Sequence, residues 1–441
     1  MRRATFKGGV HPYDGKEITK DNAIQVIMPK GELVYPLAQH IGAPATPVVA
    51  VGDQVLVGQV IAEASSFISA NICCSVSGTV KAIEKRLTST GTMVDSIIVE
   101  NDGEYKEIEG FGKKRDFTKL KKEEIRSIVR EAGIVGLGGA GFPTDVKITP
   151  KDEAKIEYII VNGAECEPYL TSDYRLMLEE TEKVVTGLKI VLSLFPNAKG
   201  IIGIEKNKPE AIEALTKAVA GEANIEVASL KTKYPQGGER SLIYATTGRK
   251  INSKMLPAEA GCIVNNVATL VAVAEAVCES KPLISGVVTV TGDCITNPGN
   301  FKFRTGMSYD ELIEAAGGFT GEPEKLIAGG PMMGFALINT NVPLTKTSSA
   351  LLCFKKDEVA ELETSNCIRC GKCVGACPSG LVPAMLNQAV KRNNLERFEE
   401  LNGFECTECG SCSYACPAKI QLTQAFKGAK RRIAAAKNNA K

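Results

Sequence analysis

Eight of the fifteen cysteines fall in two copies of one spacing. The pattern is C-x2-C-x2-C-x3-C-P, and it runs from Cys367 to Pro378 and again from Cys406 to Pro417. Bacterial ferredoxins ligate [4Fe–4S] clusters with this spacing. Pairs of cysteines also bind zinc, but zinc sites usually lack the C-x3-C-P ending. The two copies therefore predict two iron–sulfur clusters, which transfer electrons one at a time.

The fourth cysteine of each copy is expected to cross to the other cluster. Three closely spaced thiolates reach three irons of one cube, whereas the fourth ligates the second cube in two-cluster ferredoxins. The expected ligand sets are Cys367, Cys370, Cys373 and Cys416 for one cluster, and Cys406, Cys409, Cys412 and Cys377 for the other. Between the copies, apolar residues recur at helical spacing over 381–401. This pattern predicts an α-helical ferredoxin domain.

A glycine-rich loop lies far upstream of the cysteines. Its glycines are Gly136, Gly138, Gly139 and Gly141. The dinucleotide fingerprint of a Rossmann fold follows a strand, but here an amphipathic helix is expected at 122–132. The loop therefore does not match the ordinary Rossmann fingerprint, because a helix and not a strand precedes it. Bare backbone N–H groups can still approach a phosphate or a flat ring, and Lys147 could add a positive charge. The alternative is a flexible linker, which Phe142 and Pro143 disfavour.

Strands and helices alternate after this loop. Strands are expected at 156–161, 200–205 and 225–230, and helices at 173–194, 209–220 and 265–278. The alternation predicts βαβ units and a mostly parallel sheet. Ligands bind beyond the carboxyl ends of such strands. We therefore expect the polar loops at 162–168 and 234–240 to form one site with the glycine loop and with Asn265 and Asn266.

These motifs, taken in order, resemble a known family. The glycine loop, Asn-x-x-Glu-x-Glu-Pro, Tyr-x-x-Gly-Gly-Glu and Val-Asn-Asn-Val-x-Thr-Leu are similar to the flavin- and NADH-binding subunit of respiratory complex I. The opening Phe6-Lys7-Gly8-Gly9-Val10-His11-Pro12 and the double cysteine run resemble the C-subunit family of the Rnf ion-translocating oxidoreductases more closely. The resemblance covers nearly the whole chain. It implies FMN as a cofactor beside the two clusters, and NAD(H) as substrate.

The resemblance also implies roles for individual residues. Lys147 would lie near the FMN phosphate, and Glu167 and Glu239 would face the nicotinamide nucleotide. The remaining flavin-binding residues would be the four loop glycines with Asn162, Glu165, Gly238, Asn265 and Asn266. The chain departs from complex I in two places. Gly237-Gly238-Glu239 stands in place of Gly-Glu-Glu, and Val135 and Leu137 stand in place of two arginines. Only one of those two acids, and neither arginine, is therefore carried over.

The predicted fold class is multidomain α/β with four units. Residues 1–112 hold a lipoyl-like β-sandwich (barrel-sandwich hybrid), 113–284 the parallel-sheet FMN/NADH-binding core, 285–350 a β-grasp module, and 351–441 the helical ferredoxin domain. The hairpin lysine that carries a prosthetic group in lipoyl domains is not evident. Ser65, Ser66 and Phe67 lie in that region instead. A structural role is therefore expected for the sandwich.

Composition excludes several other functions. Lys+Arg total 53 against 51 Asp+Glu, and Trp is absent. No nucleic-acid partner is expected, because such proteins need a basic field and stacking aromatics. No apolar stretch reaches the roughly 18 residues of a membrane span, and the N-terminus lacks the apolar core of a signal peptide. The chain is therefore expected in the cytoplasm.

The expected function is that of a peripheral subunit on the cytoplasmic face of a membrane. The resemblance implies exchange of hydride between NAD(H) and FMN, passage of single electrons through the clusters, and partners that are the other Rnf subunits, including a ferredoxin-type subunit. Membrane subunits would move Na+ or H+. One alternative is a soluble flavin and iron–sulfur reductase of the cobalamin-reductase type, which would not be expected to carry the segment at 7–12. The other is a non-enzymatic electron wire that has lost its nucleotide site, against which Glu167, Glu239, Asn265 and Asn266 argue.

Overall fold

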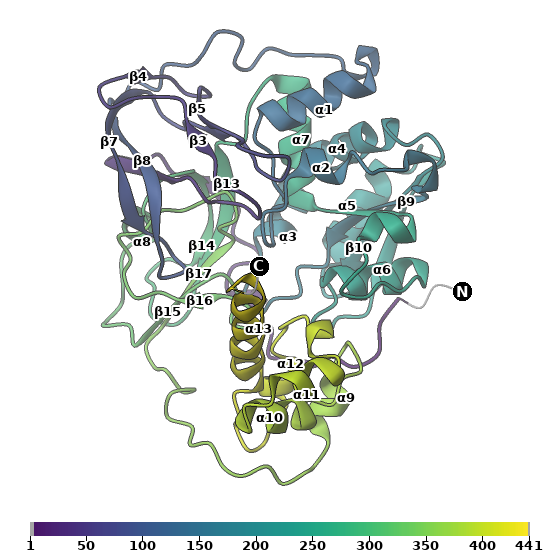
Figure 1. The fold of residues 1–441 in the computed structure, drawn as a ribbon. Coiled ribbons are helices and arrows are strands. Elements are labelled where there is room, and N and C mark those ends of the chain that lie inside the picture. Colours follow the sequence, from purple (N-terminus) through teal and green to yellow (C-terminus); the bar gives the residue numbers. More distant parts are fainter. Residues whose placement is uncertain (1–3, 440–441) are drawn as a thin grey trace.

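The computed structural model describes residues 4–439 (Figure 1). The predicted ends of the first and last units at 1–3 and 440–441 lie outside this range. Four units have separate hydrophobic cores. We call them the sandwich unit (31–110), the parallel-sheet unit (122–279), the mixed-sheet unit (285–354) and the cysteine unit (363–439). No helix within 4–439 is long and apolar enough to cross a lipid bilayer.

The sandwich unit is built from two small antiparallel sheets. One sheet has the order β2-β8-β7-β4 and the other the order β3-β5-β6. Leu33 and Val99 from the first sheet and Ile61 and Ile72 from the second share one core, because alternate strand residues point to the same face. The strands are β2 (Glu32–Pro36), β3 (Thr46–Pro47), β4 (Gln54–Val55), β5 (Val60–Glu63), β6 (Ile72–Cys73), β7 (Gly78–Leu87) and β8 (Met93–Asn101).

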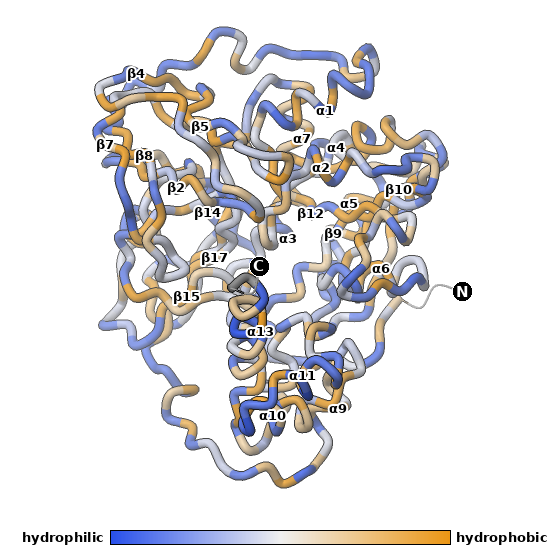
Figure 2. The backbone as a smooth tube through the Cα atoms, viewed as in Figure 1, coloured by the Kyte–Doolittle hydropathy of each residue, from blue (hydrophilic) through white to orange (hydrophobic). Residues whose placement is uncertain are grey.

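The parallel-sheet unit has four strands in the order β11-β10-β9-β12, and every pair is parallel. Ile159 and Val161 pack under one layer of helices, whereas Ile160 packs under α6 on the opposite face. This alternation makes three layers, and Figure 2 shows the hydrophobic positions along the strands. The elements are α1 (Lys122–Glu131), α2 (Thr144–Lys147), β9 (Tyr158–Gly163), α3 (Ser172–Glu179), α4 (Thr181–Ser193), β10 (Lys199–Glu205), α5 (Pro209–Ala218), β11 (Ile225–Leu230), α6 (Glu239–Thr247), β12 (Cys262–Asn266) and α7 (Val267–Glu279).

Two sequence expectations for this unit need correction. The single helix expected at 173–194 is two helices that meet at Glu180, whose φ of −122° is not helical. The Thr181 hydroxyl donates to the Met177 carbonyl at 2.6 Å, a side-chain bond that competes with the helical ladder. The helix expected to start at Asn265 starts two residues later, at Val267. Asn265 lies in β12, and Asn266 caps α7 by accepting from the backbone N–H of Ala268 at 2.7 Å.

The mixed-sheet unit has six strands in the order β1-β14-β13-β17-β15-β16. Its edge strand β1 comes from the N-terminal region and pairs parallel to β14. The predicted span 1–112 therefore contains a strand that belongs to another unit's sheet. The elements are β1 (Ile24–Val26), β13 (Ser285–Thr291), β14 (Gly299–Arg304), α8 (Tyr309–Ala315), β15 (Lys325–Ala328), β16 (Phe335–Ala336) and β17 (Ala350–Phe354).

The cysteine unit is helical, as its apolar spacing predicts. Leu386, Phe398 and Phe426 are fully buried in its core. Each cysteine run forms a loop and one short helix, and the long α13 packs against α10 between the runs and against α12 of the second run (Figure 1). The helices are α9 (Lys372–Ala376), α10 (Pro383–Lys391), α11 (Leu395–Glu400), α12 (Ser411–Tyr414) and α13 (Leu422–Asn439).

Candidate functional site

The polar loops at the carboxyl ends of β9, β11 and β12 and the glycine loop line one large cavity of about 1710 Å³. All four units contribute to its wall, including Phe67 of the sandwich unit, Gly330 of the mixed-sheet unit and Lys427 of the cysteine unit. The predicted site residues on its lining are Gly136, Gly138, Gly139, Gly141, Lys147, Asn162, Glu165, Glu167, Gly238, Glu239 and Asn266. Of the predicted flavin and nucleotide residues, only Asn265 does not line the cavity.

The glycine loop exposes bare backbone to this cavity. Gly138 has a φ of +68°, and a Cβ there would lie 2.8 Å from the Asn266 side-chain nitrogen. A Cβ on Gly139 would meet nothing within 4 Å. The loop is anchored at Leu137, whose backbone N–H donates to the Thr269 hydroxyl at 2.9 Å. Because side chains are absent here, a flat ring or a phosphate can come close to the peptide groups.

Lys147 supplies a cation at the base of the same loop. Its ammonium donates to the carbonyl of Val264 at 2.8 Å. Burial lowers the pKa of Lys147, and the charge of Glu239 acts in the opposite direction. Glu239 is the first residue of α6 and is exposed. The two side chains therefore present one positive and one negative group in a single cavity.

The carboxylate of Glu165 is engaged by the start of α3. It accepts from the backbone N–H groups of Asp173 at 2.7 Å and Tyr174 at 3.3 Å. Burial raises the pKa of Glu165, and the nearby Lys16 lowers it. Each of its two oxygens thus accepts a hydrogen bond within the protein. Its expected role toward the flavin stays a proposal.

Asp173 is a site residue that sequence reasoning missed. Its carboxylate lines the cavity and accepts from the side-chain nitrogen of Asn266 at 2.6 Å. Burial, followed by the neighbouring charge of Glu165, raises the pKa of Asp173 to about 7. In the sequence it is only an acid in the first turn of a helix, where acids are common. Nothing in the local pattern distinguishes it.

Glu167 is held from two directions. One carboxylate oxygen accepts from the Tyr234 hydroxyl at 3.3 Å, and the other from the backbone N–H of Met332 at 3.1 Å. A Cβ on Gly330 would lie 2.2 Å from this carboxylate, so the mixed-sheet loop closes directly over it. Burial raises the pKa of Glu167 to about 7. This carboxyl group can therefore hold or release a proton near neutral pH.

Two buried lysines fix the loop that carries Glu165 and Glu167. Lys16, from the N-terminal region, donates to the backbone carbonyl of Glu167 at 3.0 Å. Lys208 donates to the carbonyl of Ala164 at 2.6 Å and lies 3.6 Å from the Glu205 carboxylate. Sequence reasoning missed both lysines. Their partners lie 151 and 44 residues away along the chain, and no motif links them.

The cysteines of the two runs approach one another across the runs. Burial raises the pKa of Cys412 to about 12, and the neighbouring thiols of Cys406, Cys409 and Cys377 raise it further. Burial also raises the pKa of Cys373, with Cys416 and Cys367 as its neighbouring thiols. These neighbours agree with the crossed pattern expected for the fourth cysteines. Within 4–439, no three His, Cys, Asp or Glu side chains surround a point suited to a single metal ion.

The two runs have matching backbone turns. Arg369 and Glu408 occupy the same place in their runs and have φ values of +57° and +58°. The following glycines, Gly371 and Gly410, have φ values of +74° and +82°. In each run these two left-handed residues flank a cysteine, Cys370 or Cys409, so the two loops turn the chain in the same way.

Four family models match successive parts of the chain. They are the RnfC barrel-sandwich hybrid domain (4–104), the Nuo51 FMN-binding domain (129–275), the SLBB domain (287–336) and the 4Fe-4S dicluster domain (363–420). The C subunit of the Na(+)-translocating ferredoxin:NAD(+) oxidoreductase complex of Acetobacterium woodii is 44% identical over 99% of this chain and 98% of its own length. This chain belongs to the RnfC family.

Other members of the RnfC family also match most of this chain. The C subunit of the proton-translocating ferredoxin:NAD(+) oxidoreductase complex of Clostridium ljungdahlii is 45% identical over 87% of this chain and 84% of its own length. The C subunit of the ion-translocating oxidoreductase complex of Rhodobacter capsulatus is 40% identical over 98% of this chain and 84% of its own length. The family expected from the sequence is therefore confirmed.

A solved structure shares the fold. A chain of an NAD+-reducing [NiFe]-hydrogenase in the H2-reduced state matches with a TM-score of 0.51 at 20% identity. The match covers 71% of this chain and 61% of the hydrogenase chain. The multidomain α/β architecture with a C-terminal iron–sulfur unit, expected from the sequence, agrees with this likeness and with the family models.

The cofactors expected from the sequence agree with the matched FMN-binding and 4Fe-4S dicluster domains of this RnfC chain. The residues present also fit FMN. The four glycines of the loop and Lys147 all line the cavity, and a Cβ on Gly139 would meet nothing within 4 Å. Lys147 and the open glycine loop suit the FMN phosphate.

Proposed function

We propose that this chain exchanges hydride between NAD(H) and FMN in the cavity and passes single electrons through two [4Fe–4S] clusters. It would do so as a peripheral subunit on the cytoplasmic face of a membrane, in a ferredoxin:NAD oxidoreductase that translocates Na+ or H+. Bound FMN would supply the change from two-electron to one-electron chemistry, since nicotinamides transfer hydride and clusters transfer single electrons.

One observation carries this proposal: Tyr234 contacts both the cavity wall and the cysteine unit. Its hydroxyl donates to Glu167, and its ring packs in a small apolar cluster with Val10 and Ala376. This group of apolar side chains is also contacted by Cys166, Met332 and Cys409. The cavity wall and a predicted cluster ligand therefore share one buried contact. A dry, packed connection of this kind suits electron transfer between two redox groups in one chain.

The cavity residues have separate tasks in this proposal. Lys147 would hold the FMN phosphate, and the glycine loop would take the flat ring system against its backbone. Glu167 and Glu239 would face the nicotinamide nucleotide. Because the pKa of Glu167 is raised to about 7, it can hold a proton at its carboxyl oxygen or present a negative charge, depending on pH. The mixed-sheet loop at Gly330 lies directly over this carboxylate.

The clusters would be ligated by crossed sets. Cys367, Cys370, Cys373 and Cys416 would hold one cluster, and Cys406, Cys409, Cys412 and Cys377 the other. Cys367 and Cys370 are exposed, whereas Cys412 is buried. The first cluster would thus be the one open to a partner, and a ferredoxin-type subunit of the complex is the partner we propose. Ile368, which is 69% exposed between these two cysteines, adds apolar surface there.

The test is anaerobic reconstitution of the full chain followed by titration with NADH. We expect one FMN and about eight irons per chain, since two four-iron clusters are predicted. NADH should bleach first the flavin and then the cluster absorbance. About four irons or fewer, zinc in their place, or flavin that NADH does not reduce would reject the proposal. Flavin and clusters that bind normally but do not respond to NADH would favour the electron wire instead.

A further inference from the structure

The N-terminal strap, residues 4–20, runs between the parallel-sheet unit and the cysteine unit (Figure 1). The strap contains the Lys7-Gly8-Gly9-Val10 segment, which the proposed function leaves without a role. Val10 exchanges two backbone hydrogen bonds with Tyr234, at 2.8 and 2.9 Å. The backbone N–H of Gly9 donates to the carbonyl of Ala376, in α9, at 2.8 Å. Two adjacent residues of the strap therefore hold two different units.

Gly8 and Gly9 fit this gap only because they lack side chains. Both have a φ of +83°. A Cβ on Gly8 would lie 2.6 Å from the carbonyl oxygen of Cys377, and a Cβ on Gly9 would lie 2.6 Å from the carbonyl oxygen of Tyr234. Backbone lies on both sides, so neither neighbour can move away as a flexible side chain would. The strap is thus a spacer of minimal thickness.

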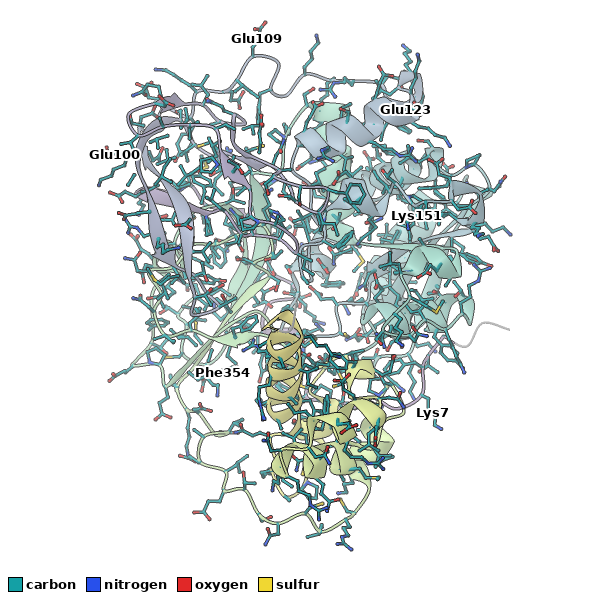
Figure 3. The ribbon with its side chains drawn as sticks, in the orientation of Figure 1. Lys7, Glu100, Glu109, Glu123, Lys151 and Phe354 are labelled. Carbon is teal, nitrogen blue, oxygen red and sulfur yellow. The ribbon has the colours of Figure 1, made fainter. Side chains whose placement is uncertain are left out.

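Further contacts fix the strap along its length. The Lys233 ammonium donates to the carbonyl of Phe6 at 2.8 Å and lies 4.2 Å from the centre of its ring. Phe6 and Val10 are buried, whereas Lys7 between them is exposed and lies beside the cysteine unit (Figure 3). Further along, Lys16 holds the backbone of Glu167. One segment therefore reaches the Glu167 loop, the Tyr234 loop and the Cys377 loop.

We propose that the strap sets the spacing between the flavin cavity and the cluster ligated by Cys377, which makes Gly8 and Gly9 positioning residues for electron transfer. The inference rests on the proposed function. Gly8 touches the backbone of a predicted cluster ligand, while Gly9 and Val10 touch Tyr234, whose hydroxyl reaches Glu167 in the cavity. Electron transfer between two redox groups slows as the distance between them grows. A thicker strap would push the two loops apart.

The test compares Gly8→Ala with Gly110→Ala in the full chain, reconstituted with FMN and clusters. Gly110 has a φ of +82° and open space where the added methyl group would lie, so its substitution brings the backbone strain without the contact. Rapid mixing with NADH separates flavin bleaching from cluster bleaching. In Gly8→Ala we expect flavin bleaching at the wild-type rate and cluster bleaching slower than in wild type by several-fold. Gly110→Ala should match wild type in both phases.

Two readouts other than turnover accompany the rates. Amide hydrogen exchange at Val10 and Tyr234 should speed up in Gly8→Ala, because the paired hydrogen bonds open. The electron paramagnetic resonance spectrum of the cluster ligated by Cys377 should change, while that of the cluster ligated by Cys367 stays the same. A wild-type rate of cluster bleaching in Gly8→Ala would overturn the inference. A wild-type chain whose flavin ignores NADH would instead overturn the proposed function.

Lys233→Met is a second variant that tests the same inference if Gly8→Ala does not bind its clusters. This variant loosens the strap at Phe6 without adding a clash. We expect full iron content and cluster bleaching about three-fold slower than wild type, with unchanged flavin bleaching. If Gly8→Ala loses iron and Lys233→Met transfers electrons at the wild-type rate, the strap only builds the cysteine unit and the inference is wrong.

Discussion

The Tyr234 hydroxyl donates to the Glu167 carboxylate at 3.3 Å, although 67 residues separate them along the chain. The tyrosine comes from the loop after β11 and the glutamate from the loop after β9. The backbone N–H of Met332 completes the arrangement from a third unit. The carboxylate at the predicted nicotinamide site is therefore held by groups that also contact the cysteine unit.

Glu167→Gln should remove a pH dependence of NAD+ binding. The pKa of Glu167 is raised to about 7, so its carboxyl group is neutral below pH 7 and negative above it. The nicotinamide ring is cationic in NAD+ and neutral in NADH. Raising the pH from 6 to 8 should therefore strengthen NAD+ binding relative to NADH by about five-fold, or roughly 1 kcal/mol. Product-inhibition constants measured across this range give the ratio.

In Glu167→Gln the ratio of NAD+ binding to NADH binding should change less with pH than in wild type, because glutamine keeps the hydrogen-bond acceptor but carries no charge. Asp173 also titrates near pH 7, so the difference between the two proteins is the quantity to compare. Glu213→Gln, on the exposed face of α5, is the matched control and should behave as wild type. Equal slopes in Glu167→Gln and wild type would place the nicotinamide away from Glu167.

Lys147→Met should weaken FMN binding by about ten- to a hundred-fold. A hydrogen bond to a charged group contributes about 1.5–3 kcal/mol, and Lys147 is the cation at the base of the glycine loop. Titration of the flavin-free chain by fluorescence quenching measures the affinity. The FMN affinity of Lys147→Arg should lie between those of wild type and Lys147→Met, since arginine keeps the positive charge but changes its geometry. Lys217→Met, an exposed site on α5, should have no effect, and an equal loss there would contradict the assignment.

Local sequence patterns were enough to predict those parts of the site whose residues lie close together in the chain. The cysteine spacing is contained within two short runs, and the strands β9, β10 and β11 follow from apolar runs that end in polar loops. The prediction of one helix at 173–194 was wrong because the apolar period continues through Glu180. Only the side-chain bond of Thr181 to the preceding turn marks the break.

The remainder depends on contacts that no local pattern encodes. Lys16 and Glu167 are brought together by the path of the N-terminal strap, and Asp173 and Asn266 by the parallel order of β9 and β12. In the sequence, Gly8 and Gly9 are only part of the segment that carries the family resemblance. Their role as a spacer appears only when the Cys377 and Tyr234 carbonyls are seen on either side.

The crossed ligand sets predict which cysteine substitutions act alike. Cys377→Ser and Cys412→Ser lie in different runs but should remove the same cluster, because their thiols are neighbours. Cys373→Ser should remove the other cluster, although it lies only four residues from Cys377. Each variant should retain about four irons per chain. Iron analysis with electron paramagnetic resonance of the reduced protein identifies the remaining cluster. Identical spectra for Cys373→Ser and Cys377→Ser would show that each run holds its own cluster.

Asp173→Asn should stabilise the protein at alkaline pH. Burial raises the pKa of Asp173 to about 7, well above its value in an unfolded chain. The folded state therefore binds more protons than the unfolded state between about pH 4 and 7, and wild-type stability falls as the pH rises through that window. Asparagine accepts the bond from Asn266 and never ionises, so the variant avoids this loss.

The expected gain for Asp173→Asn at pH 8 is about 1–2 kcal/mol, which corresponds to a rise in Tm of a few degrees. The gain should be smaller at pH 5.5, because part of the penalty is not yet present there. The charges of Glu165 and Asp173 repel each other, so removing the Asp173 carboxylate also eases the ionisation of Glu165 and adds to the gain. Anaerobic thermal unfolding at the two pH values measures the difference, with Asp310→Asn on α8 as an exposed control. A gain that does not grow with pH would mean that Asp173 is ionised in the folded protein well below pH 7.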